Sequence, residues 1–393
     1  MQLCYVFFQV FRIYFLFMQN NDNTQKKLQY QAELFANRLS KKYKLLKKWA
    51  RKNRISCYRL YDKDIPEIPL AADIYEFLPD EISDKTGCAF FLRENDLNIS
   101  SNDQNAISET KMRTYLHLYL YERPYEKDES EEEKWLDSMA ESAAKVLQIP
   151  QCHIIKKLRK KQKGDSQYEK LETQNKIEGT TQECGQLFKI NLSEYLDAGL
   201  FLDHRPLRNL VRQTVQGKSV LNLFCYTGSF SVYAAEGRAS RIESVDLSNT
   251  YILWAKENMA LNGFTDNAKY FYTRQDATGF LNQKNAEVPN EQGTNRYDTI
   301  ILDPPTFSNS KSTQNVLDIN RDWLALCEKC LKILKPKGTL YFSTNSRRLS
   351  FSEEELRQKL PELKLQIQDI TVQTIPEDFN GKKPHRCWKI SLF

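Results

Sequence analysis

Metal-binding residues are scarce in this sequence. Four histidines occur among 393 residues, and the nine cysteines are scattered along the chain. Cys327 and Cys330 form a C-x-x-C pair inside an apolar helical pattern, whereas a structural zinc site requires four ligands. An odd number of dispersed cysteines is typical of reduced thiols in a cytosolic protein. We therefore expect no metal site and a cytoplasmic location.

The sequence also lacks a long apolar run. Its most apolar stretch, residues 1–18, contains Arg12 and is shorter than the roughly 20 residues that a membrane span needs. It has no basic start and no small-residue cleavage site of a secretory signal. We expect residues 1–23 to be an irregular extension, with Met18 as the working start and no membrane partner. A membrane anchor is the alternative.

The charge balance is mildly basic, with a net charge of +6. Residues 41–54 contain eight lysines or arginines and no acid, and residues 156–163 contain six basic residues. Such clusters can neutralise RNA phosphates without reading a sequence, although either could be a solvated helix face. Two clusters in one half of the chain predict RNA binding there. The second cluster contributes the expected RNA-binding residues Lys156, Lys157, Arg159, Lys160, Lys161 and Lys163.

Residues 24–193 predict a helical and α+β domain that binds RNA. Apolar residues recur at helical spacing in its first part, and short apolar runs between polar loops follow. The expected elements are helices at 24–53 and 131–147 and strands at 57–61, 89–92 and 115–121.

Residues 194–393 alternate between strands and helices, which predicts an α/β domain with a doubly wound, mostly parallel sheet. Two late strands, at 364–371 and 387–392, predict an antiparallel edge. The other expected strands lie at 219–224, 242–245, 269–272, 299–302 and 339–343, and the expected helices lie at 230–236, 250–262, 277–282, 321–334 and 353–360.

A complete G-x-G-x-x-G fingerprint is missing, which disfavours a dehydrogenase. The loop after the first strand of the alternating half instead contains Gly228, which allows close approach of a ligand. Asp246 and Asp276 follow the next two strands, where doubly wound sheets bind ligands. We expect Asp246 to accept hydrogen bonds from ribose hydroxyls and Asp276 to accept one from the adenine amino group. Each could instead cap a helix, but together they predict an adenosyl site.

The fourth strand leads into Asp303, Pro304, Pro305 and, after one further residue, Phe307. Two prolines stiffen the backbone and project the following residues over the cofactor. Phe307 offers a face on which a base can stack, and Asp303 can meet the sulfonium end of the cofactor or a base edge. These four are the expected catalytic residues.

These loops resemble those of the class I S-adenosylmethionine-dependent RNA methyltransferases. The chain from about residue 28 onward is similar to the guanine-N7 half of the bifunctional 23S rRNA methyltransferases, the RlmKL family. The most specific stretches are GLFLDHR at 199–205 and DPPTFSNSK at 303–311. The other matching stretches are residues 37–39, 47–51, 57–62 and 161–168.

This resemblance implies a Rossmann-like sheet and S-adenosyl-L-methionine as the cofactor. Residues 199–205 would lie against its methionine part and the target base. Gln167 and Tyr168, in the hinge between lobes, and Lys311 join the expected RNA-binding residues. The expected cofactor-binding residues are Asp203, Arg205, Phe224, Tyr226, Thr227, Gly228, Asp246, Leu247, Asp276, Ala277 and Asp303.

The resemblance further implies methylation of guanine N7 in 23S rRNA or in a large-subunit assembly intermediate. N7 carries a lone pair and no proton, so the reaction needs alignment and charge stabilisation but no general base. A cytosine-C5 enzyme needs a nucleophilic cysteine, and residues 342–346, where relatives carry it, contain none. An exocyclic-amine methyltransferase is the second alternative, and a non-catalytic RNA-binding protein that keeps the fold is the third.

Overall fold

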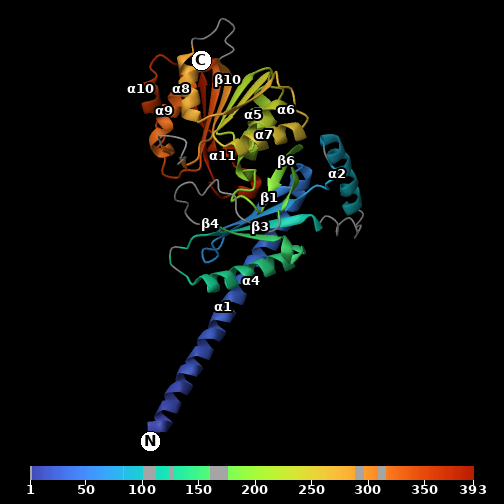
Figure 1. Cartoon of the computed structure of the whole chain (residues 1–393), viewed down its shortest axis with the longest axis vertical. Helices are drawn as coiled ribbons and strands as arrows, with labels where there is room; N and C mark the ends of the chain where they lie inside the picture. The colour runs from blue at the N-terminus through green and yellow to red at the C-terminus, as the bar shows by residue number, and fades with distance from the viewer. Residues whose placement is uncertain are drawn as a thin grey trace. The chain divides into compact units, whose positions relative to one another are not determined.

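The computed structural model describes residues 2–82, 84–100, 112–123, 125, 127–159, 176–287, 296–308 and 316–393, with the backbone alone for 2–23, 92, 94–100, 158 and 159. The chain divides into two compact units (Figure 1). The first unit comprises Met1–Lys52, Tyr58–Glu76 and Gln104–Lys161, and the second comprises Asn53–Cys57, Phe77–Asp103 and Gln162–Phe393.

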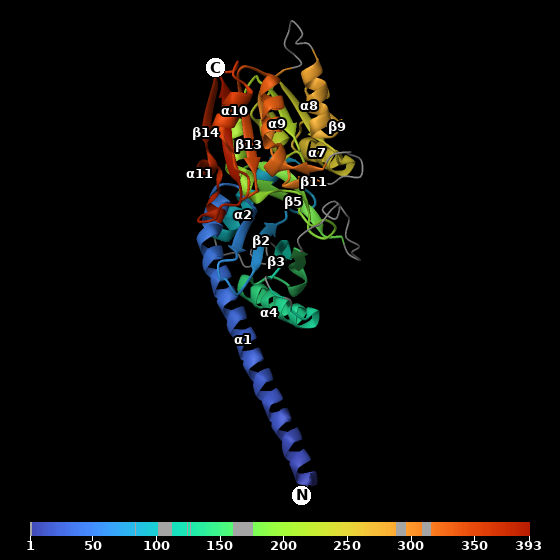
Figure 2. The same cartoon turned by 90° about the vertical axis from the view of Figure 1, so that its left-hand side faces the viewer.

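The first unit contains a four-stranded sheet and two long helices. Its strand order is β1 (Cys57–Asp62), β2 (Leu70–Glu76), β3 (Thr114–Tyr121) and β4 (Ile154–Arg159). Strands β2 and β3 are antiparallel, whereas β3 and β4 are parallel. Helices α1 (Gln2–Lys52) and α4 (Glu129–Leu147) pack against each other (Figure 2). These elements confirm the α+β character predicted from the apolar periodicity.

Two local expectations differ from the structure. The backbone is helical from Gln2, so residues 2–23 continue α1 instead of forming an irregular extension. Residues 89–92 lie in helix α2 (Lys85–Ser100) and not in a strand. The helix starts where Asp84 accepts a hydrogen bond from the Gly87 amide, and its Cys88 side chain packs with Leu187. The run lies in a helix in which Ala89 and Phe90 are exposed, and four apolar residues are too few to distinguish a helix from a strand.

The second unit is built on a seven-stranded sheet, which confirms the doubly wound α/β fold. Its order is β14 (Leu365–Asp369), β15 (Arg386–Leu392), β13 (Leu334–Thr344), β10 (Tyr297–Leu302), β7 (Ser219–Leu223), β8 (Arg241–Asp246) and β9 (Tyr270–Arg274). Strands β9, β8, β7, β10 and β13 are parallel, and β15 runs antiparallel to both neighbours. The predicted antiparallel edge is thus confirmed. The strand order reverses between β7 and β10, which is where such sheets bind ligands.

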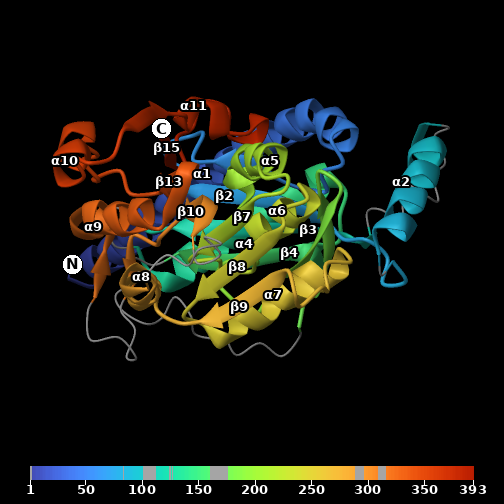
Figure 3. The same ribbon diagram turned by 90° about the horizontal axis from the view of Figure 1, so that it is seen from above.

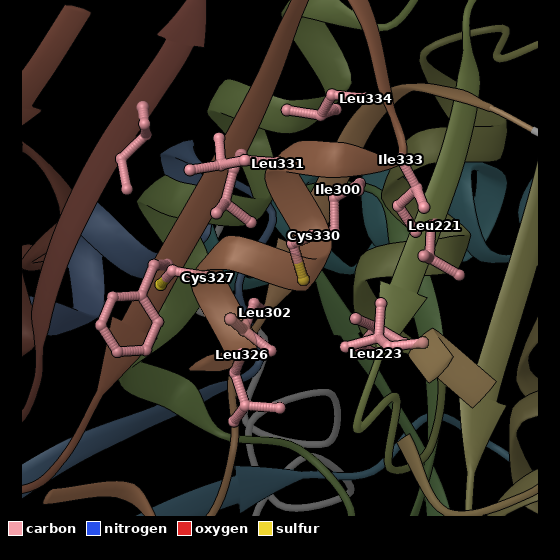
Figure 4. Packing of buried hydrophobic residues seen from close by; sticks show 14 of the residues in the cluster. Leu221, Leu223, Ile300, Leu302, Leu326, Cys327, Cys330, Leu331, Ile333 and Leu334 are labelled. Carbon is pink, nitrogen blue, oxygen red and sulfur yellow. The ribbon is translucent and has the colours of Figure 1, made fainter. Parts of the chain in front are cut away.

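Helices cover both faces of this sheet (Figure 3). Helices α5 (Arg205–Thr214), α6 (Ser229–Glu236) and α7 (Asn249–Leu261) form one layer, and α8 (Ala277–Ala286), α9 (Ile319–Lys332) and α10 (Glu353–Lys359) form the other. In the core between α9 and the sheet, Cys327 and Cys330 pack on leucines of β7 and β10 (Figure 4). Both cysteines are therefore helix-face core residues, as the helical pattern predicted. Smaller elements are α11 (Thr371–Thr374), β11 (Phe307–Ser308) and β12 (Leu317–Asp318).

The hairpin of β5 (Glu178–Glu183) and β6 (Gln186–Asn191) belongs to the second unit, although the sequence placed it before a domain boundary at residue 194. Asn258 of α7 and Asn262, which caps the C-terminus of α7, accept hydrogen bonds from the backbone amides of Lys189 and Leu187, each at 2.9 Å. These bonds join residues about 70 positions apart, so no local pattern could report them. Among the described residues, no helix is long and apolar enough to span a membrane.

Candidate active site

The loop after β7 has an unusual backbone that only a few residues can adopt. Phe224, Tyr226 and Gly228 have positive φ angles of 54°, 51° and 75°. A Cβ atom on Gly228 would lie 2.7 Å from Cβ of Ala255, so glycine is required both by its φ angle and by the close approach of α7. Helix α6 therefore begins directly after this loop, and Gly228 packs against Ala255 of α7.

Asp246 at the end of β8 holds this loop in place. Its Oδ2 accepts a hydrogen bond from the Tyr226 amide and its Oδ1 accepts one from the Ser248 amide, each at 2.9 Å. Burial raises the pKa of Asp246 to about 6, although these backbone donors oppose the shift. The carboxylate is thus ionised near pH 7 and can accept charge-assisted hydrogen bonds from vicinal hydroxyls. This carboxylate, at the end of the strand beside the loop after β7, suits the ribose hydroxyls of an adenosyl ligand.

Asp276 at the end of β9 caps helix α8, because its Oδ2 accepts a hydrogen bond from the Gly279 amide at 2.8 Å. The alternative that the sequence offered for Asp276, a helix cap, is therefore confirmed. Its expected bond to an adenine amino group stays a prediction, because a carboxylate has a second oxygen. The neighbouring Leu247 is half-buried and Ala277 is buried, so any contact from their side chains would be apolar.

A second segment, residues 197–199, is tied to the loop after β7. The Thr227 hydroxyl donates a hydrogen bond to the carbonyl oxygen of Gly199 at 2.6 Å, and the Tyr226 hydroxyl donates one to that of Asp197 at 3.4 Å. A Cβ on Gly199 would come within 2.4 Å of the Trp254 ring. The expected cofactor-binding residues Tyr226 and Thr227 therefore also anchor the GLFLDHR segment beside the loop.

The structure brings Asp203 and Asp303 close to the same ring nitrogen of one histidine. Nε2 of His204 lies 3.7 Å from Oδ2 of Asp203 and 3.6 Å from Oδ2 of Asp303. The Ser343 hydroxyl donates to Oδ1 of Asp303 at 2.5 Å. Burial lowers the pKa of His204, because charging a buried ring costs more than the two carboxylates return. The site thus pairs two carboxylates with a neutral imidazole near pH 7.

His385 completes this group from the segment before β15. Its Nδ1 lies 2.9 Å from Oδ2 of Asp203, and its Nε2 lies 3.0 Å from the Thr374 hydroxyl. The rings of His204 and His385 stack at 4.3 Å with planes only 15° apart. Because imidazole donates to a metal within its ring plane, two parallel rings cannot point at one ion without rotating. Asp203, His204 and His385 are close enough for a metal site, but this geometry suits hydrogen bonding instead.

The loop after β10 contains the four expected catalytic residues, Asp303, Pro304, Pro305 and Phe307, and is called the catalytic loop below. Pro304 is buried and Pro305 half-buried, and the Thr306 hydroxyl donates to Oδ1 of Asn345 at 2.6 Å. Phe307 pairs with Asp318 in the short β11–β12 ladder. Its side chain is 55% exposed, which is unusual for phenylalanine. An aromatic ring on a braced loop next to Asp303 is a suitable platform for a base.

The expected role of Arg205 in cofactor binding is wrong in this structure. Its guanidinium is buried and donates to Glu183, to Asp378 and to the carbonyl oxygen of Cys57, at 2.8 to 3.0 Å. Arg208 also binds Glu183. All three nitrogens of Arg205 are therefore used inside the protein. The polar sequence of GLFLDHR indicated a site, but could not show which of its charges points inward.

Sequence reasoning did not single out His204, His385 and Ser343 as site residues. His204 lay inside a stretch that was identified, so its position was available. His385 and Ser343 are 182 and 40 residues from their aspartate partners. Neither lies in a motif, and only the sheet brings them to the site.

Few of the expected RNA-binding residues can be evaluated. Lys156 forms an ion pair with Asp137, and the side chain of Lys157 is buried in β4. A buried lysine differs from the exposed position that a phosphate ligand requires. Arg159 is described by its backbone alone. The remaining predicted residues lie outside the described part of the chain: Lys160, Lys161, Lys163, Gln167, Tyr168 and Lys311.

The cysteines nearest the site are buried. Cys225 lies in the loop after β7 and Cys387 in β15, and burial raises the pKa of each thiol well above its usual range. A nucleophilic cysteine requires the thiolate form. Both residues are therefore structural, as their apolar sequence surroundings predicted.

Comparisons with known sequences agree with this geometry. A family model of S-adenosylmethionine-dependent methyltransferases matches residues 102–389. The chain is 40% identical over 91% of its length to ribosomal RNA large subunit methyltransferase K of Neisseria meningitidis serogroup B, of which it covers 86%. It is 39% identical over 91% of its length to ribosomal RNA large subunit methyltransferase K/L of Pseudoalteromonas atlantica, but it spans only 44% of that longer protein.

Solved structures share the fold. A candidate S-adenosylmethionine-dependent methyltransferase from Streptococcus mutans is 20% identical and aligns with a TM-score of 0.63 over 92% of this chain and 81% of that one. A candidate methyltransferase crystallised with SAH is 19% identical, with a TM-score of 0.62 and the same coverage. At this level of identity the likeness concerns the fold alone.

Proposed function

This chain belongs to the family of S-adenosylmethionine-dependent methyltransferases, and on that basis we propose that it methylates guanine N7 in 23S rRNA or in a large-subunit assembly intermediate. S-adenosylmethionine is the cofactor of the family. The relatives named as ribosomal RNA large subunit methyltransferases support the class of RNA. A cytoplasmic location would follow from such a substrate.

The observation that carries the proposal is the pair of carboxylates around a neutral His204. When bound, S-adenosylmethionine supplies an electrophilic methyl group on a cationic sulfonium. Methylation of N7 leaves positive charge on the purine. Asp203 and Asp303 stabilise positive charge near them, and the effect is strong where water is scarce. A neutral His204 keeps that negative field, which a charged imidazolium would partly cancel.

The catalytic loop would hold the base. The exposed ring of Phe307 can stack on a purine, and the Pro304–Pro305 pair limits the movement of that ring. Fixed geometry matters most for a reaction that needs only alignment of the acceptor nitrogen with the methyl carbon and the sulfur. A duplex guanine would have to leave its stack, so we expect an unpaired or flipped nucleotide.

The chemistry of the described site supports N7 over cytosine C5. Methylation at C5 begins with attack of a thiolate on the base, and the site cysteines Cys225 and Cys387 are buried with raised pKa values. At the end of β13, where a nucleophile would follow the fifth strand, Ser343 is instead hydrogen-bonded to Asp303.

The decisive experiment maps the methyl group on the product. Unmodified 23S rRNA transcript is incubated with the full chain and S-adenosylmethionine, treated with borohydride and aniline, and analysed by mass mapping. Strand scission at one guanine is expected, because N7 methylation weakens the glycosidic bond. A methyl group on cytosine C5 or on an exocyclic amine would keep the fold and overturn the N7 assignment. Cofactor binding without any methyl transfer to the transcript or to precursor particles would contradict the enzymatic proposal.

A further inference from the structure

The exposed side of helix α1, in the first unit, carries a row of lysines that has no role in the candidate active site described above. Lys41, Lys44, Lys48 and Lys52 are all exposed. They are three or four residues apart, which places them on one side of a helix with 3.6 residues per turn. We call these four residues the lysine row. At 1.5 Å per residue the row extends over about 16 Å.

The apolar side of the same helix fixes the direction in which the row faces. Phe35, Leu39, Leu46 and Ala50 are buried at the complementary helical spacing. At about 100° per residue, the mean direction of the lysine row lies roughly opposite that of the buried residues. Because α1 packs through its buried side within the first unit, the row faces away from that unit's core.

No acidic side chain among the described residues neutralises the lysine row. None of its four ammonium groups forms an ion pair with a described residue, although other lysines of the unit do: Lys156 pairs with Asp137 and Lys127 approaches Glu132. The stretch from residue 41 to residue 54 contains no acid at all. A solvated helix normally mixes both signs of charge. A one-sign row instead creates a positive field along a line.

We propose that the lysine row binds the phosphate backbone of the RNA substrate, an inference that rests on the proposed RNA methyltransferase function. Ammonium groups bind phosphates as point charges and read no sequence. Four donors in line along about 16 Å suit consecutive phosphates of one strand better than a compact anion. The row would supply affinity and orientation, while the nucleotide is selected at the catalytic loop. It replaces Lys157, whose side chain is buried, as the phosphate-binding part of the first unit.

The test compares two pairs of substitutions in the first unit with equal changes in charge. One variant carries Lys44→Gln and Lys48→Gln in the row. The control carries Lys134→Gln and Lys145→Gln, two exposed lysines of α4. Binding of the full chain to a 23S rRNA transcript is measured between 50 and 300 mM salt. Each phosphate contact contributes about 0.7–0.9 to the slope of log affinity against log salt, so the row variant should lose about 1.5 of slope and the control none.

Several outcomes would overturn the inference. An unchanged slope in the row variant excludes phosphate contacts there, and an equal loss in the control shows only a general effect of net charge. Row-dependent binding to phosphatidylserine vesicles with no binding to rRNA would assign the row to a membrane surface. Cofactor affinity measured by calorimetry distinguishes a failure of the proposed RNA methyltransferase function from a failure of the lysine-row proposal. A wild-type chain that binds S-adenosylmethionine but no RNA refutes the proposed substrate, whereas RNA binding with a row-independent slope refutes the lysine row alone.

Discussion

The Nε2 atom of His204 lies 3.6 Å from Oδ2 of Asp303, at the end of the strand that carries the catalytic loop. Nδ1 of His204 is buried and has no hydrogen-bond partner among the described residues. A proton on Nε2 faces two carboxylates, whereas a proton on Nδ1 would be a buried donor without an acceptor. The neutral tautomer with hydrogen on Nε2 is therefore favoured, and at 3.6 and 3.7 Å this N–H faces the carboxylates of Asp303 and Asp203 beyond hydrogen-bond distance, so that it acts on them through its dipole.

Replacement of His204 should separate its donor role from its bulk. His204→Gln keeps an N–H donor, whereas His204→Ala removes it. We expect the alanine variant to lose turnover by about tenfold, which corresponds to about 1.4 kcal/mol of transition-state stabilisation, and the glutamine variant to lose clearly less. Steady-state kinetics at saturating cofactor measures this difference. Equal losses in both variants would show that His204 only fills space.

The lowered pKa of His204 also predicts an acid-dependent loss of stability. Burial lowers the folded-state pKa below the ordinary value of about 6.5. As pH falls through that value, the unfolded chain binds the proton first, and the folded state loses stability until its own pKa is passed. Lowering the pH from 7.5 to 5.5 should therefore reduce the free energy of unfolding of the wild type more than that of His204→Gln. Urea unfolding at the two pH values measures both changes. A pH-independent difference between the two proteins would contradict the buried neutral state.

Asp246→Asn should weaken cofactor binding and change its pH dependence. The loss expected at pH 7.5 is about 10- to 100-fold, because an amide replaces a charged acceptor. The folded-state pKa of Asp246 is about 6, so wild-type affinity should fall as pH drops through 6 and the carboxylate is protonated. Calorimetry between pH 5 and 8 measures both effects. The cofactor affinity of an Asp276→Asn variant is measured for comparison, because Asp276 lies at the end of the neighbouring strand β9. A wild-type cofactor affinity that does not change with pH would contradict the role of Asp246.

Phe307→Ala should impair RNA methylation without affecting the cofactor. Base stacking on an aromatic side chain is worth about 1–3 kcal/mol, which corresponds to a loss of about 5- to 150-fold in kcat/KM for RNA. Phe307→Trp restores an aromatic face and should recover most of the activity. A loss of cofactor affinity in the alanine variant, measured by calorimetry, would show that Phe307 belongs to the cofactor site instead.

Arg205→Leu should destabilise the fold and leave the cofactor site chemically intact. The change removes the bonds that compensate the buried carboxylates of Glu183 and Asp378, and such a loss costs about 3–5 kcal/mol. The matched control is Arg321→Leu, whose pair with Asp322 is exposed, so its loss should change stability much less. Urea unfolding gives both values. A fully stable Arg205→Leu protein with weakened cofactor binding would restore the role that the sequence suggested for Arg205.

The sequence by itself determined the order of the strands and helices in the second unit and the residue types at the ends of its strands. The apolar periodicity of residues 219–392, together with Asp246, Asp276 and Asp303 directly after strands, predicted a doubly wound sheet with a ligand at its carboxyl edge. These signals are local, since each lies within one strand, one turn and one helix. A resemblance over most of the chain, most specific at residues 199–205 and 303–311, then identified the methyltransferase family.

Only the tertiary structure decided which charges face the site and which are buried. Arg205 is next to His204 in the chain, yet it turns inward to Glu183 and Asp378 while His204 meets Asp303. Lys157 is buried although it lies in a basic run, whereas the lysine row on α1 is exposed. Burial and ion pairing depend on partners tens to hundreds of residues away. Local sequence patterns contain no information about those partners, because the fold alone brings them together.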